Sequence, residues 1–256
     1  MTNTNRETTS LPRYEYLDVL RGVTLISMIL YHALWDLVYI AGVNIKWFRG
    51  MGAHIWQQSI CWTFILLAGF CWSFGRNKWK RGCIVFGAGL LVTLVTLVLM
   101  PQQRVVFGVL TLLGSCMLFM IPLHKLFGKV PPIIGACLAA GLFLLFKNVN
   151  AGYLGVGEIV FAELPTKWYD CGWFMTYLGF TDRAFYSTDY FSLFPWFFLF
   201  MTGYFLNRAM KEKGMLDAPL LGKIKSRPLA FLGRNSLMVY LLHQPIVYGG
   251  VAILFL

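Results

Sequence analysis

The chain has 256 residues, of which 58% are hydrophobic and only 13% are charged. Its mean hydropathy is +0.64 and its formal net charge is +11. Soluble domains carry about 25% charged residues, and a soluble fold could not cover this much apolar surface. The composition therefore excludes an ordinary soluble protein and predicts an integral membrane protein.

Several apolar runs approach or exceed the roughly 20 residues that a helix needs to cross the hydrocarbon of a bilayer. Long runs favour helical spans over the short alternating segments of a membrane β-barrel. We predict an all-α, polytopic helix bundle with about seven spans and a cytoplasmic N-terminus. The expected spans are Leu17–Gly42, His54–Gly75, Gly82–Met100, Val105–Phe127, Pro131–Phe146, Phe191–Met210 and Leu229–Leu256.

The orientation is predicted from Lys and Arg, which accumulate in cytoplasmic loops. With the N-terminus inside, most cations fall on the inner side: Arg6, Arg13, Arg76, Lys78, Lys80, Arg81, Lys125, Lys129, Arg208, Lys211, Lys213, Lys223, Lys225 and Arg227. Fewer fall outside: Lys46, Arg49, Arg104, Lys147, Lys167 and Arg183. Topology thus explains the positive charge. Nucleic-acid binding has no support, since the cations are dispersed and no recognition motif is present.

The remaining organisation is simple. We expect a polar leader over residues 1–16, no cleavable signal peptide, and one transmembrane domain over 17–256 with a long outside loop at about 147–190. That loop is rich in aromatic residues and is interpreted as a lid or substrate-facing cap. The six cysteines show no spacing typical of a disulfide framework or a metal site, so no metal is expected.

Ionisable groups inside a span are costly, so each is a functional candidate. On a helix that turns about 100° per residue, one stripe of the first span holds Asp18, Arg21, His32, Trp35, Asp36 and Tyr39. His32 and Asp36 are four residues apart, so the carboxylate is expected to orient the imidazole for general-base or nucleophilic work. Asp18 and Arg21 form either an internal ion pair or an anion site.

Further candidates lie at other span ends. His54 and Gln58 share a face of the second span, and Tyr240 and His243 share a face of the last span. His54 is either an interfacial residue or a substrate contact, and His243, which precedes Gln244-Pro245, either belongs to a helix kink or contacts substrate. Asp189 either binds an amine or hydroxyl of a substrate or caps the helix that follows it.

Four segments in order carry a resemblance to a known family. They are Arg13-Tyr-Glu-Tyr-Leu-Asp18-Val-Leu-Arg21-Gly22 with Tyr31-His32-Ala-Leu-Trp-Asp36; Val106-Phe-Gly-Val-Leu-Thr111-Leu-Leu-Gly114; Thr188-Asp189-Tyr190-Phe191 through Pro195-Trp196; and Phe231-Leu-Gly233-Arg234-Asn235-Ser236-Leu with Tyr240 and His243-Gln244-Pro245. Together they resemble bacterial members of the heparan-α-glucosaminide N-acetyltransferase catalytic-domain family.

The resemblance implies a multi-pass acyltransferase of a bacterial cytoplasmic membrane. Such an enzyme takes acetyl from cytoplasmic acetyl-CoA and passes it to an amine or hydroxyl of a glycan or amino sugar on the far side. A histidine of the bundle is the implied catalytic group. Thr111 stands where the family pattern leads us to expect a histidine, so the chain either uses His32 or has lost the activity. Of the residues present, we assign the catalytic role to His32 with Asp36. Donors to the developing oxyanion are expected from Arg234, Asn235, Tyr240 or Gln57.

Two other function classes stay open at this stage. The polar stripe of the first span would also suit a small-molecule or ion transporter, and a non-catalytic membrane scaffold is a third interpretation. Membrane lipids, acetyl-CoA and a glycan acceptor are the expected partners, and a homo-oligomer is compatible with the sequence.

Overall fold

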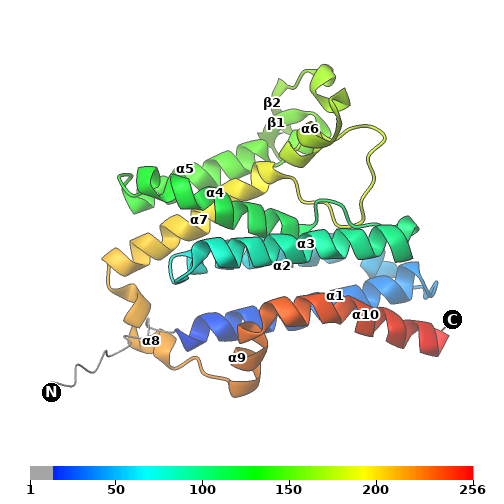
Figure 1. The fold of residues 1–256 in the computed structure, drawn as a ribbon, viewed down its shortest axis with the longest axis horizontal. Coiled ribbons are helices and arrows are strands. Elements are labelled where there is room, and N and C mark those ends of the chain that lie inside the picture. Colours follow the sequence, from blue (N-terminus) through cyan, green and yellow to red (C-terminus); the bar gives the residue numbers. More distant parts are fainter. Residues whose placement is uncertain (1–13, 256) are drawn as a thin grey trace, which may run out of the picture.

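The computed structural model describes residues 14–255, so the predicted leader lies almost wholly outside the described part. The described residues form a helical bundle with one small β-hairpin (Figure 1). The long helices are α1 (Glu15–Tyr39), α2 (Met51–Trp72), α3 (Lys78–Leu99), α4 (Val109–Phe127), α5 (Pro132–Phe146), α7 (Leu193–Glu212) and α10 (Ser236–Phe255). The shorter elements are β1 (Tyr153–Val156), β2 (Ile159–Glu163), α6 (Gly172–Leu178), α8 (Pro219–Gly222) and α9 (Arg227–Arg234), with several 3-10 turns.

The predicted polytopic helix bundle is confirmed. Within residues 14–255, six helices are long and apolar enough to cross a membrane: α1, α2, α3, α4, α5 with the turn after it, and α10. Helix α7, the other predicted span, packs against α2 and α5 but is less apolar, because Tyr204, Asn207 and Arg208 interrupt it. Helix α1 begins at one end of the molecule and α10 ends at the other, which fits an odd number of crossings (Figure 1). We call the end where α1 begins the inner end.

The last predicted span was too long. The expected run Leu229–Leu256 is divided at Asn235 into α9 and α10. The backbone leaves helical geometry there, and the Asn235 side chain donates to the carbonyl oxygen of Phe231 at 2.9 Å, which caps α9. Arg234 therefore lies at the end of a short helix and not inside a span.

The bundle has two layers. In one, α1 packs against α9 and α10, and in the other α2, α7 and α5 pack in sequence beside the α3–α4 pair. Figure 1 shows the α1–α10 layer below α2 and α3. Contacts between α1 and α2 and between α10 and α3 join the layers. The space between them holds the candidate site.

Helices within each layer approach closely where glycine faces a neighbouring backbone. A Cβ atom on Gly233 of α9 would lie 1.9 Å from the carbonyl oxygen of Asp18, and one on Gly69 of α2 would lie 1.9 Å from that of Phe200. Such contacts are typical of membrane helices, whose association depends on close packing because lipid is as apolar as the side chains. They fix α9 on α1 and α7 on α2.

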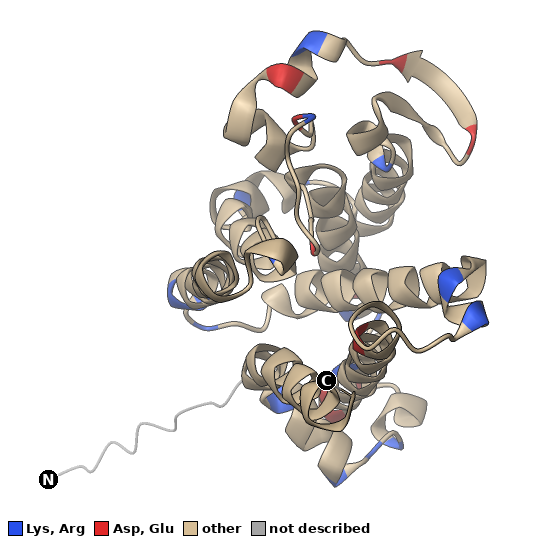
Figure 2. Ribbon diagram, turned by 90° about the vertical axis from the view of Figure 1, so that its right-hand side faces the viewer, with Lys and Arg blue, Asp and Glu red and all other residues tan. Residues whose placement is uncertain are grey.

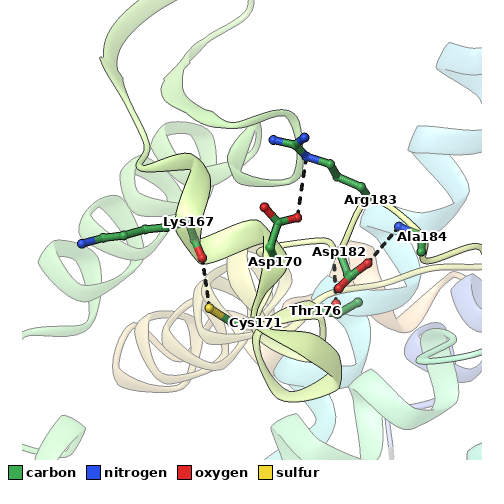
Figure 3. Close-up of polar contacts among 7 residues, drawn as sticks. All are labelled: Lys167, Asp170, Cys171, Thr176, Asp182, Arg183 and Ala184. Atoms are coloured by element: carbon green, nitrogen blue, oxygen red, sulfur yellow. Dashed lines mark hydrogen bonds and ion pairs between the residues drawn. The ribbon is translucent and has the colours of Figure 1, made fainter.

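The long outside segment between α5 and α7 is folded. Strands β1 and β2 pair antiparallel, and α6 follows them (Figure 1). Figure 2 marks the charged residues of this segment along its ribbon, at the strands, the turn before α6 and the stretch before α7. Asp170 pairs with Arg183 at 3.6 Å, and the Asp182 carboxylate accepts from the Ala184 N–H at 2.8 Å (Figure 3). Both contacts lie within the segment and hold its loops together.

Candidate active site

A cavity of about 520 Å³ lies between the two layers. Its walls are apolar, with Phe64 and Leu67 from α2, Val85 from α3 and Leu113 from α4. Its two ends carry different polar side chains: cations at the inner end, and the neutral Tyr240 near the outside segment. An apolar cavity with a few polar groups at its ends is the usual form of a small-molecule site.

Four cations line the inner end of the cavity. Arg21 comes from α1, Lys80 and Arg81 from the start of α3, and Arg234 from the end of α9. No acidic side chain of the described residues lines the cavity, although Asp18 pairs with Arg21 at 3.6 Å from beside it. Guanidinium and ammonium groups are the side-chain groups that commonly bind phosphate-like anions.

Tyr240 joins the cavity to the outside segment. Its hydroxyl lies 3.5 Å from Oδ2 of Asp189, and the same oxygen accepts from the backbone N–H of Val109 at 3.3 Å. Val109 begins α4, so Asp189 caps that helix from the segment before α7, rather than capping α7 as one reading of the sequence suggested. Burial raises the pKa of the Asp189 carboxyl group, and the hydrogen bonds from Val109 and Tyr240 act in the opposite direction.

His243 lies beside Tyr240, and His32 lies beside His243, although neither histidine lines the cavity. The His243 ring is 5.3 Å from the Tyr240 ring and 4.9 Å from the His32 ring, measured between centroids. Nδ1 of His243 is bonded to the Tyr240 carbonyl oxygen, which can only accept, so Nδ1 carries the proton. Nε2 of His243 is buried and has no hydrogen-bond partner among the described residues. A neutral His243 therefore presents an unpaired nitrogen that can accept a proton.

The predicted His32–Asp36 pairing does not form. Asp36 is fully buried, and its two carboxylate oxygens accept from the Gln244 side-chain amide at 3.1 and 3.2 Å. Helix α10 packs on this face of α1, so the Gln244 amide, and not the His32 imidazole, is the hydrogen-bond partner of the Asp36 carboxylate. Asp36 thus ties α1 to α10, and the His32 ring lies against the rings of His243 and Tyr31.

The other predicted residues either line the cavity or lie away from it. Asn235 lines the inner end of the cavity, close to Arg234. His54 is exposed near the outer end of α2, and Gln58 accepts from Trp62 in its own helix, so neither lines the cavity. Thr111 is buried where α4 crosses α3: a Cβ atom on Gly89 would lie 2.6 Å from its hydroxyl. Thr111 therefore faces a helix contact and does not line the cavity.

The sequence reasoning missed two parts of the site. Lys80 and Arg81 were interpreted only as markers of the inner side, and Gln244 was noted only as a neighbour of Pro245. Arg81 carried no separate signal in the sequence, because it directly precedes the apolar run Gly82–Met100 and resembles the other cations of its link. Gln244 carried no signal either, since its role depends on the partner helix.

The comparisons with known proteins decide the family. The family model described as heparan-alpha-glucosaminide N-acetyltransferase, catalytic, matches residues 13–245. The chain belongs to this family. A search of curated proteins and one of solved structures found no match. Membership confirms the resemblance carried by the four sequence segments and makes the chain a multi-pass membrane protein of an acetyltransferase family.

Proposed function

We propose that the protein transfers an acetyl group from acetyl-CoA to an amine or hydroxyl of a sugar, across the membrane that it spans. The observation that carries the proposal is the polarity of the cavity. Four cations lie at its inner end, and Tyr240, which contacts Asp189 and His243, lies at its other end. The proposed setting is a bacterial cytoplasmic membrane, where acetyl-CoA is available on the inner side.

Acetyl-CoA would enter from the inner side. Its phosphates would lie against Arg21, Arg81 and Arg234, and its pantetheine arm would extend along the apolar walls towards Tyr240. Charge-assisted contacts of this kind are short and directional, so they would fix the donor with its thioester deep in the cavity.

The acceptor would arrive from the outer segment, with its amine or hydroxyl held at Asp189. Its nitrogen or oxygen attacks the thioester carbonyl, the carbon–sulfur bond breaks, and CoA leaves as a thiolate. Once the acceptor is bound at Asp189, the Tyr240 hydroxyl donates to the developing oxyanion instead of to Asp189. The His32–His243 pair accepts the proton that the acceptor loses, and that proton is available to the departing thiolate. His32 stays our first choice for this role, and the free Nε2 makes His243 the second.

The test is acetyl transfer by purified protein in proteoliposomes, with acetyl-CoA on the inner side and glucosamine on the outer side. We expect acetylated glucosamine by mass spectrometry, and loss of most product with His32→Ala and His243→Ala. Full activity in His32→Ala removes that residue from the mechanism. Uptake of an added solute with no acetylated product would favour the transporter interpretation.

The donor site has a separate test. Arg81→Gln removes one charge-assisted contact, worth about 1.5–3 kcal/mol, so the KM for acetyl-CoA should rise about tenfold or more. The KM for glucosamine should not change. Lys125→Gln removes an exposed inner cation outside the cavity and serves as the matched control. The measurement can be repeated for each cavity arginine with a donor that lacks the 3′-phosphate. The arginine that binds this phosphate is identified as the one whose substitution then raises the donor KM less.

A further inference from the structure

A group of aromatic side chains lies in the outside segment and the turn before α4, beside Asp189 and the Tyr240 end of the cavity. We call it the aromatic cluster, and it consists of Phe107, Trp173, Tyr177, Phe185 and Tyr190. Phe107 is its centre, with ring centroids 5.3 Å from Tyr177, 6.0 Å from Trp173 and 6.1 Å from Phe185. Phe185 in turn lies 5.1 Å from Tyr190. The segments that supply these rings are the turn before α4, helix α6 and the stretch before α7.

The cluster is joined to Asp189 by short covalent and hydrogen-bonded links. Tyr190 follows Asp189 in the chain, and Phe107 lies two residues before Val109, whose N–H binds the Asp189 carboxylate. The Phe107 carbonyl oxygen also accepts from the Phe191 N–H at 2.9 Å. A molecule held on the cluster would therefore have its reacting group near Asp189.

Two features indicate that the cluster does more than fill space. Trp173 leaves 66% of its surface exposed although it contacts Phe107 and Phe185, so the cluster has an open side. Phe107 has a φ of 54°, the left-handed region that non-glycine residues rarely adopt. Within residues 14–255 it is the only non-glycine residue with a positive φ. Such strained conformations tend to occur at functional sites.

We propose that the aromatic cluster binds the sugar ring of the acceptor, an inference that rests on the proposed function. The C–H groups on one face of a pyranose ring pack against an aromatic ring, while its hydroxyls point to polar groups at the edge. Such groups are at hand, since Asp182 and Arg183 lie three and two residues before Phe185 in the same loop. The cluster would select a cyclic amino sugar over a simple amine, and Asp189 would hold the reacting group.

The experiment compares glucosamine with ethanolamine, an amine that has no ring. In Trp173→Ala the KM for glucosamine should rise about tenfold, the loss expected for one stacking ring, while the KM for acetyl-CoA and the turnover of ethanolamine should not change. Trp173→Phe should restore much of the loss. The matched control is Phe174→Ala, since Phe174 is the next residue, is 70% exposed, and makes no ring contact among the described residues.

A direct binding measurement separates this inference from the proposed function. Saturation-transfer NMR with glucosamine and no donor should give a ring signal that weakens in Trp173→Ala and persists in Phe174→Ala. If that pattern is seen but no protein variant transfers acetyl, the proposed function fails and the sugar site stands. If transfer occurs and Trp173→Ala leaves the glucosamine KM and the NMR signal unchanged, the sugar site is overturned. If Trp173→Ala lowers thermal stability but changes neither the glucosamine KM nor the NMR signal, Trp173 is an anchor at the membrane interface and the sugar site is overturned.

Discussion

The contact between Asp36 and Gln244 allows a quantitative test of the α1–α10 interface. The Gln244 amide donates to both oxygens of a fully buried carboxylate, at 3.1 and 3.2 Å. In Gln244→Leu the amide is lost and the carboxylate stays buried. Losing a hydrogen-bond donor to a buried charged group costs about 1.5–3 kcal/mol, and we expect the upper end here because both carboxylate oxygens lose their donor.

The expected change in melting temperature follows from the size of the chain. For domains of about 150–250 residues, 1 kcal/mol shifts the midpoint by roughly 2–4 °C, so a loss of about 3 kcal/mol lowers it by about 6–12 °C. The assay is thermal unfolding of purified protein in detergent, followed by intrinsic fluorescence. Gln58→Leu is the matched control, since Gln58 makes one hydrogen bond to the neutral indole of Trp62 and should cost about 1 kcal/mol or less.

A double-mutant cycle makes the test specific. Asp36→Leu together with Gln244→Leu removes both polar partners, and replacing both with apolar groups of similar size is close to neutral. The double variant should therefore be more stable than Gln244→Leu alone. The reasoning is refuted if Gln244→Leu costs no more than Gln58→Leu, or if the double variant loses the sum of the two single losses.

Two further predictions concern packing and charge. Gly69→Val should abolish most correctly folded protein, because a Cβ atom there would lie 1.9 Å from the Phe200 carbonyl oxygen. Gly87→Val should be tolerated, because a Cβ atom at position 87 would have nothing within 4 Å. Equal monodisperse fractions of the two variants by size-exclusion chromatography would contradict this prediction. The raised pKa of Asp189 means that the folded protein binds this proton more tightly than the unfolded chain does. The ionised carboxylate therefore lowers the stability of the fold at pH values above the ordinary pKa of a carboxyl group, and has no such effect at lower pH. Asp189→Asn should accordingly gain melting temperature relative to wild type as the pH rises from 4 to 7, and a constant difference would show that its charge is not the cause.

Much of the fold could be predicted because hydropathy is a local property. Each apolar run was long enough to require a helix, and six of the seven predicted spans correspond to single helices within a few residues. The exception, at Asn235, depended on a cap and on the packing of α9 against α1, neither of which a hydropathy pattern records. Arg234 was assigned to a span for the same reason.

The candidate site divides in a similar way. From the sequence alone, the first span had to turn one polar stripe away from lipid, and Arg21, His32 and Asp36 had to lie on it. Which group each would meet depended on how helices distant in the chain pair and rotate. Gln244 reaches Asp36 from 208 positions away, and Arg81 joins Arg21 only because α3 and α1 border the same cavity. The sequence thus determined the membrane setting and the polar face, while the tertiary structure decided the partners, because a buried polar group binds whichever donor the packing brings to it.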